Sequence, residues 1–309
     1  MIHTFGYSPA TAAAIRWSRD HDIPLVIELV NTGATPYQYL PGLKRFSPYD
    51  LAHQSVIVAI SRDLGDLCQG LGLNENVWTR PNPVDTRKFE VSNNSDRLTA
   101  RQKISTASEN DILVVYVAKY LNRKKHSFLL EVLAKLPARF KLVLAGPALE
   151  DRDLVPGLKA DQIPMLKQRA NALGIGDRVE ITHGFVDMVE YLAAADVFCF
   201  PAQDEGMGTP LLEALSSGTP VVANADEPSF GEWIIDGENG YLAPLNAEQW
   251  ASAVQAAAEF GETQRKQISQ SVKARISSDV IDKQYLRLMN TLAETAPGQA
   301  VDVEQVLSS

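Results

Sequence analysis

Short, continuous runs of apolar residues recur along the chain and alternate with segments of helical pattern. Two such runs are DILVVYV at 111–117 and DVFCF at 196–200. Strands without polar alternation are typical of parallel sheets that are covered by helices on both faces. The order of the elements therefore predicts an α/β fold of doubly wound parallel sheets. The expected strands are 24–30, 55–60, 111–117, 140–145, 178–181, 196–200 and 219–223, and the expected helices are 8–19, 126–136, 161–173, 187–195, 210–217, 246–259 and 279–294.

A proline-containing stretch at 81–96, PNPVDTRKFEVSNNSD, is interpreted as a linker between two domains. Residues 1–85 hold few strand candidates, the first of which begins at the N-terminus. They predict a partial Rossmann-like domain. Residues 86–277 hold enough strands for a complete Rossmann-like domain, and residues 297–309 are expected to form a flexible tail.

The acidic balance of the chain argues against a nucleic-acid partner. Lysine and arginine total 29 against 38 aspartate and glutamate residues, giving a net charge of −9, whereas nucleic-acid binding favours a basic face. No apolar run approaches the ~18–20 residues that cross a bilayer, and the start of the chain shows no basic leader before an apolar stretch. Cys68 and Cys199 are too few for a disulfide framework, and Cys199 is interpreted as a buried thiol. These features favour a cytoplasmic protein.

The segment PAQDEGMGTPLLEALSSGTPVVA at 201–223 places two carboxylates around a glycine turn and a helix start. Thr209 is expected to cap the helix, and Gly208 lets a ligand approach the backbone. Free amides and the helix dipole would attract an anion or hydroxyl oxygens. Glu205 follows a strand at its ligand-binding end, and Glu213, one turn into the helix, is suited to a ribose diol. The alternative is that both glutamates are solvated acids flanking the helix, but the glycines and the strand favour binding.

A basic cluster in VAKYLNRKKHSF, residues 117–128, follows another expected strand. Lys119, Arg123, Lys124 and Lys125 would lie at the carboxyl end of that strand, where cations can neutralise phosphates. Two cations beside a leaving diphosphate would stabilise the charge that develops on it. A solvated turn is the alternative interpretation.

Gly146 in LAGPALEDRD, residues 144–153, is expected at a third strand end, where the lack of a side chain allows close approach of a ligand. Asp151 and Asp153 flank Arg152 in a pattern that can hold a metal ion. This tripeptide is common by chance and begins a polar loop. No other spacing of acids and histidines suggests a metal, so no metal site is expected.

Four segments together resemble the retaining glycosyltransferases of family four, which have the GT-B architecture. The stretch 204–246, from DEGMGTPLLEAL to DGENGYLAPLN, is similar to the C-terminal signature of that family. AKYLNRKK at 118–125 resembles the family's Gly-Arg-Leu…Lys-Gly segment, and RPNPVDTRKF at 80–89 resembles its domain junction. SVIVAISRDL at 55–64 resembles a strand that leads into a serine-capped helix.

The resemblance implies two Rossmann-like domains, with a nucleotide-diphosphate sugar bound mainly by the C-terminal one. It implies that the helix at 278–296 packs back on the N-terminal, acceptor-side domain. It also implies retention of the anomeric configuration, with neither a metal nor another cofactor. The residues implied are Lys119 and Lys124 for the diphosphate, Glu205 for the transferred sugar, Glu213 for the ribose, and the amides of Met207, Gly208 and Thr209 for the sugar or phosphate. Gly146 is expected among the donor-binding residues.

The chain departs from the family pattern in three places. Lys119 stands where the family has arginine, and Pro83 stands where it has the junction glycine. The family's N-terminal domain begins some three strands earlier, and Val30 and Asn31 stand where it has a histidine. The N-terminal domain is therefore expected to be incomplete on the acceptor side.

The leading hypothesis is a glycosyltransferase that moves a sugar from a nucleotide-diphosphate sugar to a saccharide or lipid-linked acceptor of the cell envelope. Peripheral contact with the inner face of the membrane is a further expectation. One alternative is a nucleotide-sugar-binding remnant that lacks transferase activity on its own. Another is a different GT-B-like enzyme, such as a sugar-nucleotide epimerase or a phosphorylase. No cofactor-lysine motif supports a phosphorylase, and the scattered histidines do not suggest an epimerase.

Overall fold

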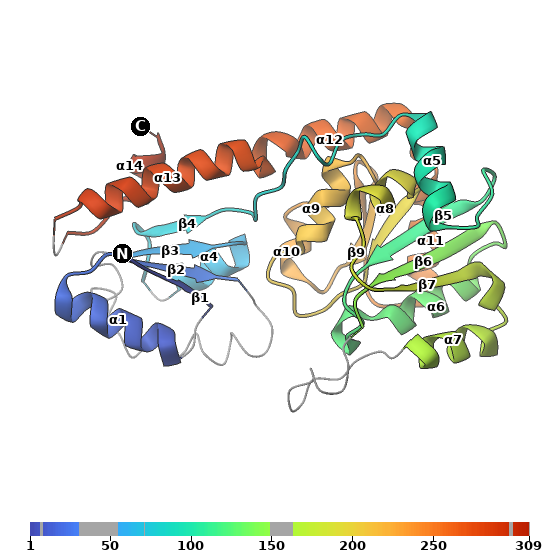
Figure 1. Cartoon of the computed structure of the whole chain (residues 1–309), viewed down its shortest axis with the longest axis horizontal. Coiled ribbons are helices and arrows are strands. Elements are labelled where there is room, and N and C mark those ends of the chain that lie inside the picture. The colour runs from blue at the N-terminus through green and yellow to red at the C-terminus, as the bar shows by residue number, and fades with distance from the viewer. Residues whose placement is uncertain (7–8, 31–54, 71, 149–162, 297–298, 309) are drawn as a thin grey trace. The chain divides into compact units, whose positions relative to one another are not determined.

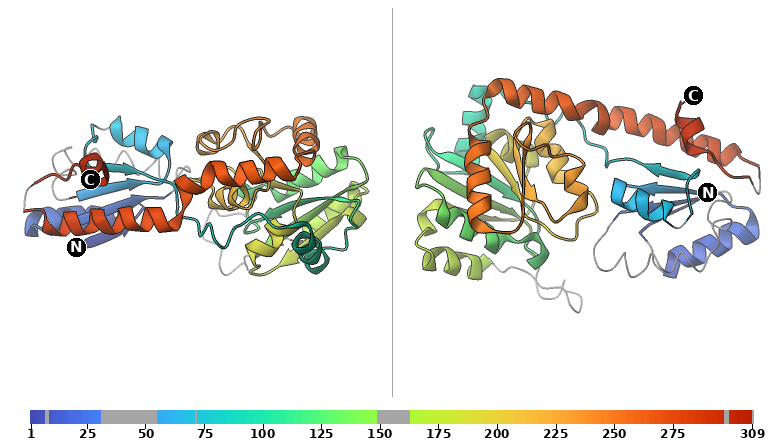
Figure 2. Two further views of the ribbon diagram at one scale, coloured as in Figure 1. Left: turned by 90° about the horizontal axis from the view of Figure 1, so that it is seen from above. Right: turned by 180° about the vertical axis from the view of Figure 1, so that it is seen from behind.

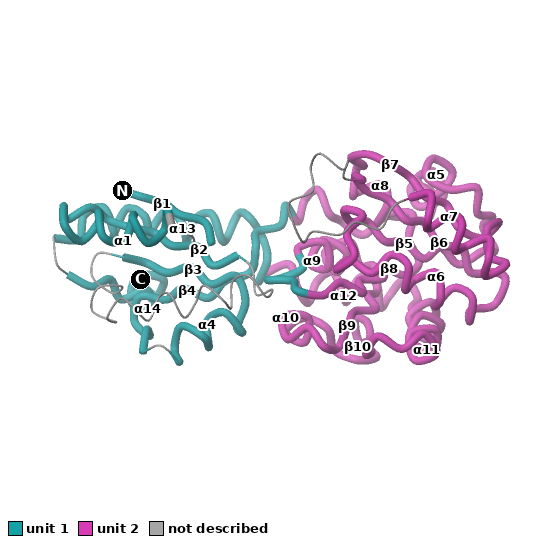
Figure 3. Tube along the Cα trace, turned by 90° about the horizontal axis from the view of Figure 1, so that it is seen from below, with its two compact units in different colours: residues 1–85, 204–208, 275–309 teal, residues 86–203, 209–274 magenta. Residues whose placement is uncertain are grey.

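The computed structural model describes residues 1–6, 9–30, 55–70, 72–148, 163–296 and 299–308 (Figure 1). The chain divides into two compact units, each described here by itself (Figure 3). The N-terminal unit comprises residues 1–85, 204–208 and 275–309, and the C-terminal unit comprises residues 86–203 and 209–274. In the described part of the chain, no helix combines the length and the apolar character needed to cross a membrane.

The N-terminal unit contains a parallel four-stranded sheet of order β1-β2-β3-β4. Its strands are β1 (Ile2–Phe5), β2 (Leu25–Leu29), β3 (Ser55–Ala59) and β4 (Val77–Thr79), and its helices are α1 (Pro9–His21), α4 (Arg62–Gln69), α13 (Ser278–Glu294) and α14 (Val303–Ser308). All five residues of β2 and of β3 are buried, as their mostly apolar sequences predict. The buried carboxylate of Glu28 in β2 is paired with the buried guanidinium of Arg80. Ser61 caps α4, as expected for a strand that leads into a serine-capped helix, because its hydroxyl accepts the N–H of Leu64 at 3.4 Å.

Helices α13 and α14 share one hydrophobic core with β2, β3 and β4. From α13, Ile281, Leu288 and Leu292 are buried in this core. The expectation of a flexible tail at 297–309 is wrong for the described residues 299–308. There, Val301 and Val303 are only 3% exposed and α14 forms. The apolar residues of this short segment have a buried face to cover, and that outweighs the usual fraying of a chain end.

The C-terminal unit contains a parallel six-stranded sheet of order β10-β9-β8-β5-β6-β7. The strands expected in this unit are confirmed to within two residues at each end. Helix α6 adjoins both α7 and α11, and α5 adjoins α8 (Figure 2). The strands are β5 (Ile112–Val117), β6 (Phe140–Gly146), β7 (Val179–His183), β8 (Val197–Phe200), β9 (Val221–Asn224) and β10 (Gly240–Ala243). The helices are α5 (Asn94–Ile104), α6 (His126–Lys135), α7 (Ile163–Ala172), α8 (Met188–Ala194), α9 (Thr209–Ser216), α10 (Pro228–Gly231), α11 (Ala247–Ala258) and α12 (Glu262–Ile276).

Three helices of this unit, α5, α10 and α12, are absent from the sequence expectation. The Asn/Ser cluster interpreted as the end of the linker begins α5, because the side chain of Asn93 accepts the N–H of Asp96 at 2.9 Å and caps the helix. Asparagine and serine favour both turns and helix N-caps, so composition alone does not separate the two. Helix α12 is mostly polar, and its apolar stripe is narrow: Ile268, Val272 and Ile276 are spaced four residues apart and are buried. Such a narrow stripe is a weak signal for helix prediction.

The strand order reverses at β5 in the C-terminal sheet. From β5 the chain continues to β6 and β7 on one side, and β8, β9 and β10 lie on the other. In open α/β sheets, ligands bind beyond the carboxyl ends of the strands at such a switch point. A ligand is therefore expected beside the segments that follow β5 and β8.

Candidate functional site

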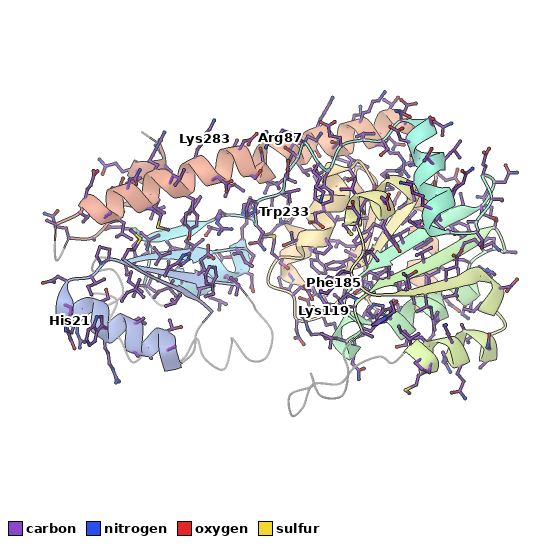
Figure 4. The ribbon with its side chains drawn as sticks, viewed as in Figure 1. His21, Arg87, Lys119, Phe185, Trp233 and Lys283 are labelled. Carbon is purple, nitrogen blue, oxygen red and sulfur yellow. The ribbon has the colours of Figure 1, made fainter. Side chains whose placement is uncertain are left out.

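The basic turn, residues 119–125, follows β5 at the switch point. Lys119 is exposed at the end of this strand (Figure 4). A short 3-10 helix, Asn122–Lys124, comes next, and Lys125 then adopts a left-handed conformation with φ of 58° before α6 begins. The hydroxyl of Tyr116, buried in β5, donates to the carbonyl of Lys124 at 2.8 Å. The turn is thus anchored from the sheet beneath it.

The loop after β8 meets the basic turn. The N–H of Gln203 donates to the carbonyl of Arg123 at 2.8 Å. The amino group of Lys124 lies 5.7 Å from the centre of the Phe200 ring at the end of β8. The structure therefore brings the basic turn to the start of the segment that carries Glu205, two residues beyond Gln203.

The glycine turn and the helix start are formed as expected. Gly208 has φ of 75°, a conformation that favours glycine, and α9 runs Thr209–Ser216, within one residue of the predicted helix. Met207 is buried, and Glu205 and Thr209 are half-buried. Residues 204–208 group with the N-terminal unit, whereas α9 belongs to the C-terminal unit.

Glu213 lies in α9 and is half-buried. Burial raises the pKa of its carboxyl group to about 7, and the nearby Lys88 partly opposes this rise. Carboxyl groups with strongly shifted pKa values are often found at functional sites. The sequence does not indicate that Lys88 is near Glu213, because Lys88 lies in the linker, far from Glu213 in the sequence.

Gly146 has a structural role that sequence did not reveal. Its φ is 142°, and an added Cβ would lie 2.7 Å from the carbonyl carbon of Ala118 and closer still to its oxygen. The lack of a side chain at Gly146 therefore lets the backbone at the end of β6 lie close to the backbone that follows β5. A contact between Gly146 and a donor stays a prediction.

A family model described as glycosyl transferases group 1 matches residues 99–274, more than half of the chain. This chain belongs to the group 1 glycosyl transferases.

Curated relatives of this glycosyl transferase chain match along part of their length. The lipopolysaccharide core biosynthesis glycosyltransferase LpsE of Rhizobium meliloti (strain 1021) is 30% identical over 197 residues, covering 61% of this chain and 52% of LpsE. The lipopolysaccharide glucosyltransferase WaaG of Escherichia coli (strain K12) is 29% identical over 171 residues, covering 55% of this chain and 43% of WaaG. The chain thus spans about half the length of these relatives.

Solved structures share the fold of this glycosyl transferase. Anabaena Alr3699/HepE, determined in complex with UDP and glucose, has a TM-score of 0.71 at 22% identity, covering 95% of this chain and 78% of that one. Sucrose-phosphate synthase from Thermosynechococcus elongatus has a TM-score of 0.78 at 20% identity, covering 96% of this chain and 74% of that one. The expected α/β fold with two Rossmann-like sheets, the GT-B architecture, is confirmed.

Aromatic side chains pack beneath the basic turn of this glycosyl transferase. His126 lies between Tyr116 and Tyr120, with ring centroids 4.8 and 4.5 Å away, and all three side chains are buried. Burial lowers the pKa of His126 to about 3, so its ring is neutral near pH 7. His126 therefore adds packing under the turn and no charge.

Asp151 and Asp153, the acidic pair considered for a metal in the sequence, lie outside the described residues, as does Asn31. Within the described ranges, no group of three or more His, Cys, Asp or Glu residues is arranged to hold a metal ion. Cys199 is fully buried, as expected, and burial raises the pKa of its thiol and that of Cys68. Buried thiols with raised pKa values are poor nucleophiles.

Proposed function

We propose that the chain binds a nucleotide-diphosphate sugar mainly through its C-terminal unit and transfers the sugar with retention of configuration. In this proposal Lys119 and Lys124 bind the diphosphate and stabilise its charge as it departs. Glu213 accepts hydrogen bonds from the ribose hydroxyls. Glu205 contacts the transferred sugar, assisted by the amides of Met207, Gly208 and Thr209.

The arrangement of the basic turn is the observation that carries the proposal. Lys119 and Lys124 come from a turn that is anchored to β5 and bonded to the loop after β8, at the switch point of the sheet. Fixed cations at this position suit a ligand with adjacent phosphates. At the same edge of the sheet, the ring of Phe185 follows β7, is 92% exposed, and offers a stacking surface for a nucleobase (Figure 4).

The acceptor in this proposal is a saccharide or a lipid-linked saccharide of the cell envelope. The support comes from relatives whose names place them in lipopolysaccharide synthesis. The reaction takes place in the cytoplasm, in contact with the inner face of the membrane, and uses no metal. Transfer that continues in the presence of a chelator would agree with the last point, whereas transfer that is restored only by an added divalent cation would contradict it.

Isothermal titration of the full chain with UDP, GDP and ADP tests donor binding. One nucleotide should bind clearly, and Lys124→Ala should weaken its binding by about tenfold or more because a phosphate-bound cation is lost. Glu205→Ala should keep nucleotide binding and abolish transfer. Failure of the wild-type chain to bind any of the three nucleotides would refute the proposed function, and binding without transfer would favour a nucleotide-sugar-binding protein.

A further inference from the structure

Arg123 is bonded to the loop after β8 at two points. Its carbonyl accepts the N–H of Gln203 at 2.8 Å, and its guanidinium Nη1 donates to the carbonyl of Gln203 at 3.4 Å. The two residues are 80 positions apart in the sequence. A reciprocal pair of bonds of this kind restricts both the spacing and the relative direction of the two segments.

The joined segments carry the residues that we assign to different parts of the donor. Lys124, assigned to the diphosphate, directly follows Arg123, and Glu205, assigned to the sugar, lies two residues after Gln203. The hydrogen-bonded joint between Arg123 and Gln203 therefore links the turn that carries Lys124 to the loop that leads to Glu205.

Both sides of this joint are fixed to the sheet. On the side of the basic turn, the hydroxyl of Tyr116 holds the carbonyl of Lys124 at 2.8 Å. On the other side, the amide of Asn224, the last residue of β9, donates to the carbonyl of Ala202 at 3.3 Å. Because both segments are anchored, a change at the joint alters their relative placement more than it alters either segment.

We propose that Arg123 is a positioning residue that holds the loop at Ala202 and Gln203, just before Glu205, against the turn of the diphosphate-binding lysines. This inference rests on the proposed function. Arg123 lies between Lys119 and Lys124 in the sequence and invites interpretation as a third phosphate ligand. The structure instead directs its guanidinium at a loop carbonyl, where it holds one binding segment against the other. Misplacement of reacting groups by about 1 Å lowers rates on the order of 100-fold.

The test compares two variants. Arg123→Lys keeps the positive charge but loses the planar guanidinium group with its N–H donors, and Arg123→Met removes both. Arg169→Met is the matched control, because Arg169 belongs to the same unit and makes an exposed ion pair with Glu131 at 3.0 Å. The probes are UDP with UDP-glucose, GDP with GDP-mannose, and ADP with ADP-glucose. Titration measures affinity for each nucleoside diphosphate, and slow hydrolysis of each sugar conjugate measures turnover with water as acceptor.

A positioning role predicts that both Arg123 variants bind the nucleoside diphosphate within about twofold of wild type. Their kcat for hydrolysis should fall by more than about tenfold, with KM little changed. Weaker nucleotide binding in Arg123→Met that is restored in Arg123→Lys would identify a phosphate ligand and overturn the inference. Unchanged kcat in both variants would overturn it as well. A wild-type chain that binds no nucleotide would instead remove the proposed function, and this role with it.

Amide hydrogen exchange of the unliganded chain provides a second measurement that needs no nucleotide. Both Arg123 variants should increase exchange at residues 203–208 by about tenfold, because the joint restrains this loop, and Arg169→Met should not. Unfolding midpoints close to wild type would show that the variants fold. Exchange at 203–208 that stays at the wild-type rate in folded variants would contradict the inference.

Discussion

Replacing Glu213 by glutamine should stabilise the C-terminal unit at pH 8 while weakening its nucleotide binding. Burial raises the pKa of this carboxyl group from 4.5 to about 7. Between pH 4.5 and about pH 7, the Glu213 carboxyl group is therefore mostly protonated in the folded chain and mostly ionised in the unfolded chain. The contribution of the protonated group to stability is fully present below about pH 4.5 and is lost as pH rises through about 7.

The size of the effect follows from the pKa shift. At 1.36 kcal/mol per tenfold change in the ionisation equilibrium, the ionised side chain costs on the order of 3 kcal/mol at pH 8 and under about 1 kcal/mol at pH 5. Glutamine is neutral at both pH values and nearly the same size, so Glu213→Gln avoids this cost. For a unit of this size, about 3 kcal/mol corresponds to a rise in the unfolding midpoint of roughly 6–12 °C at pH 8.

Thermal unfolding of the full chain at pH 5 and pH 8 is the assay. Glu248→Gln, which alters an exposed side chain of α11, is the matched control and should shift the midpoint little at either pH. Nucleotide affinity of Glu213→Gln should fall, because an amide presents one acceptor oxygen to the ribose where a carboxylate presents two. An equal gain in stability at both pH values, or none at pH 8, would refute the reasoning.

Three further predictions concern the backbone and the core. Gly146→Ala should lower the free energy of unfolding by several kcal/mol, on the order of 3, because its Cβ overlaps the carbonyl of Ala118 and its φ is positive; chemical denaturation measures this, and wild-type stability would contradict the clash. Tyr116→Phe should cost about 1 kcal/mol and loosen the basic turn, seen as faster amide exchange around Lys124; unaltered exchange there would mean that the hydroxyl does not anchor the turn. A chain ending after Glu294 should lose on the order of 2–4 kcal/mol from the N-terminal unit, because α14 no longer covers its core; an unfolding midpoint equal to that of the full chain would count against this packing.

The sequence predicted secondary structure best for the strands that lie inside the sheets. The mostly apolar runs of β2, β3, β5 and β6 are largely buried, so burial determines most of their pattern, with Glu28 and Lys141 as the charged exceptions. The helix start near Thr209 was also predictable, because threonine is a favoured N-cap and proline, here Pro210, is favoured at the first helical position.

Other features depend on partners that are distant in the sequence. The proximity of Lys88 to Glu213, and the overlap that an added Cβ on Gly146 would have with Ala118, exist only once the sheet has formed. The linkage of Arg123 to Gln203 is of the same kind, since nothing in either local sequence indicates it. Composition likewise could not distinguish the capping Asn93 from a linker asparagine.

The hydrophobic core that α13 and α14 complete also has a consequence for synthesis. The C-terminal unit is formed almost without interruption by residues 86–274, whereas the sheet formed by residues 1–85 is packed by α1 and α4 and also by α13 and α14, from residues 275–309. As the chain leaves the ribosome from its N-terminus, the first sheet emerges early but keeps one apolar face uncovered until the last helices appear. Domains usually fold in the order in which they are made. Here the unit that is translated first should be the one that finishes folding last, and its exposed strands are the ones that need protection from aggregation in the meantime.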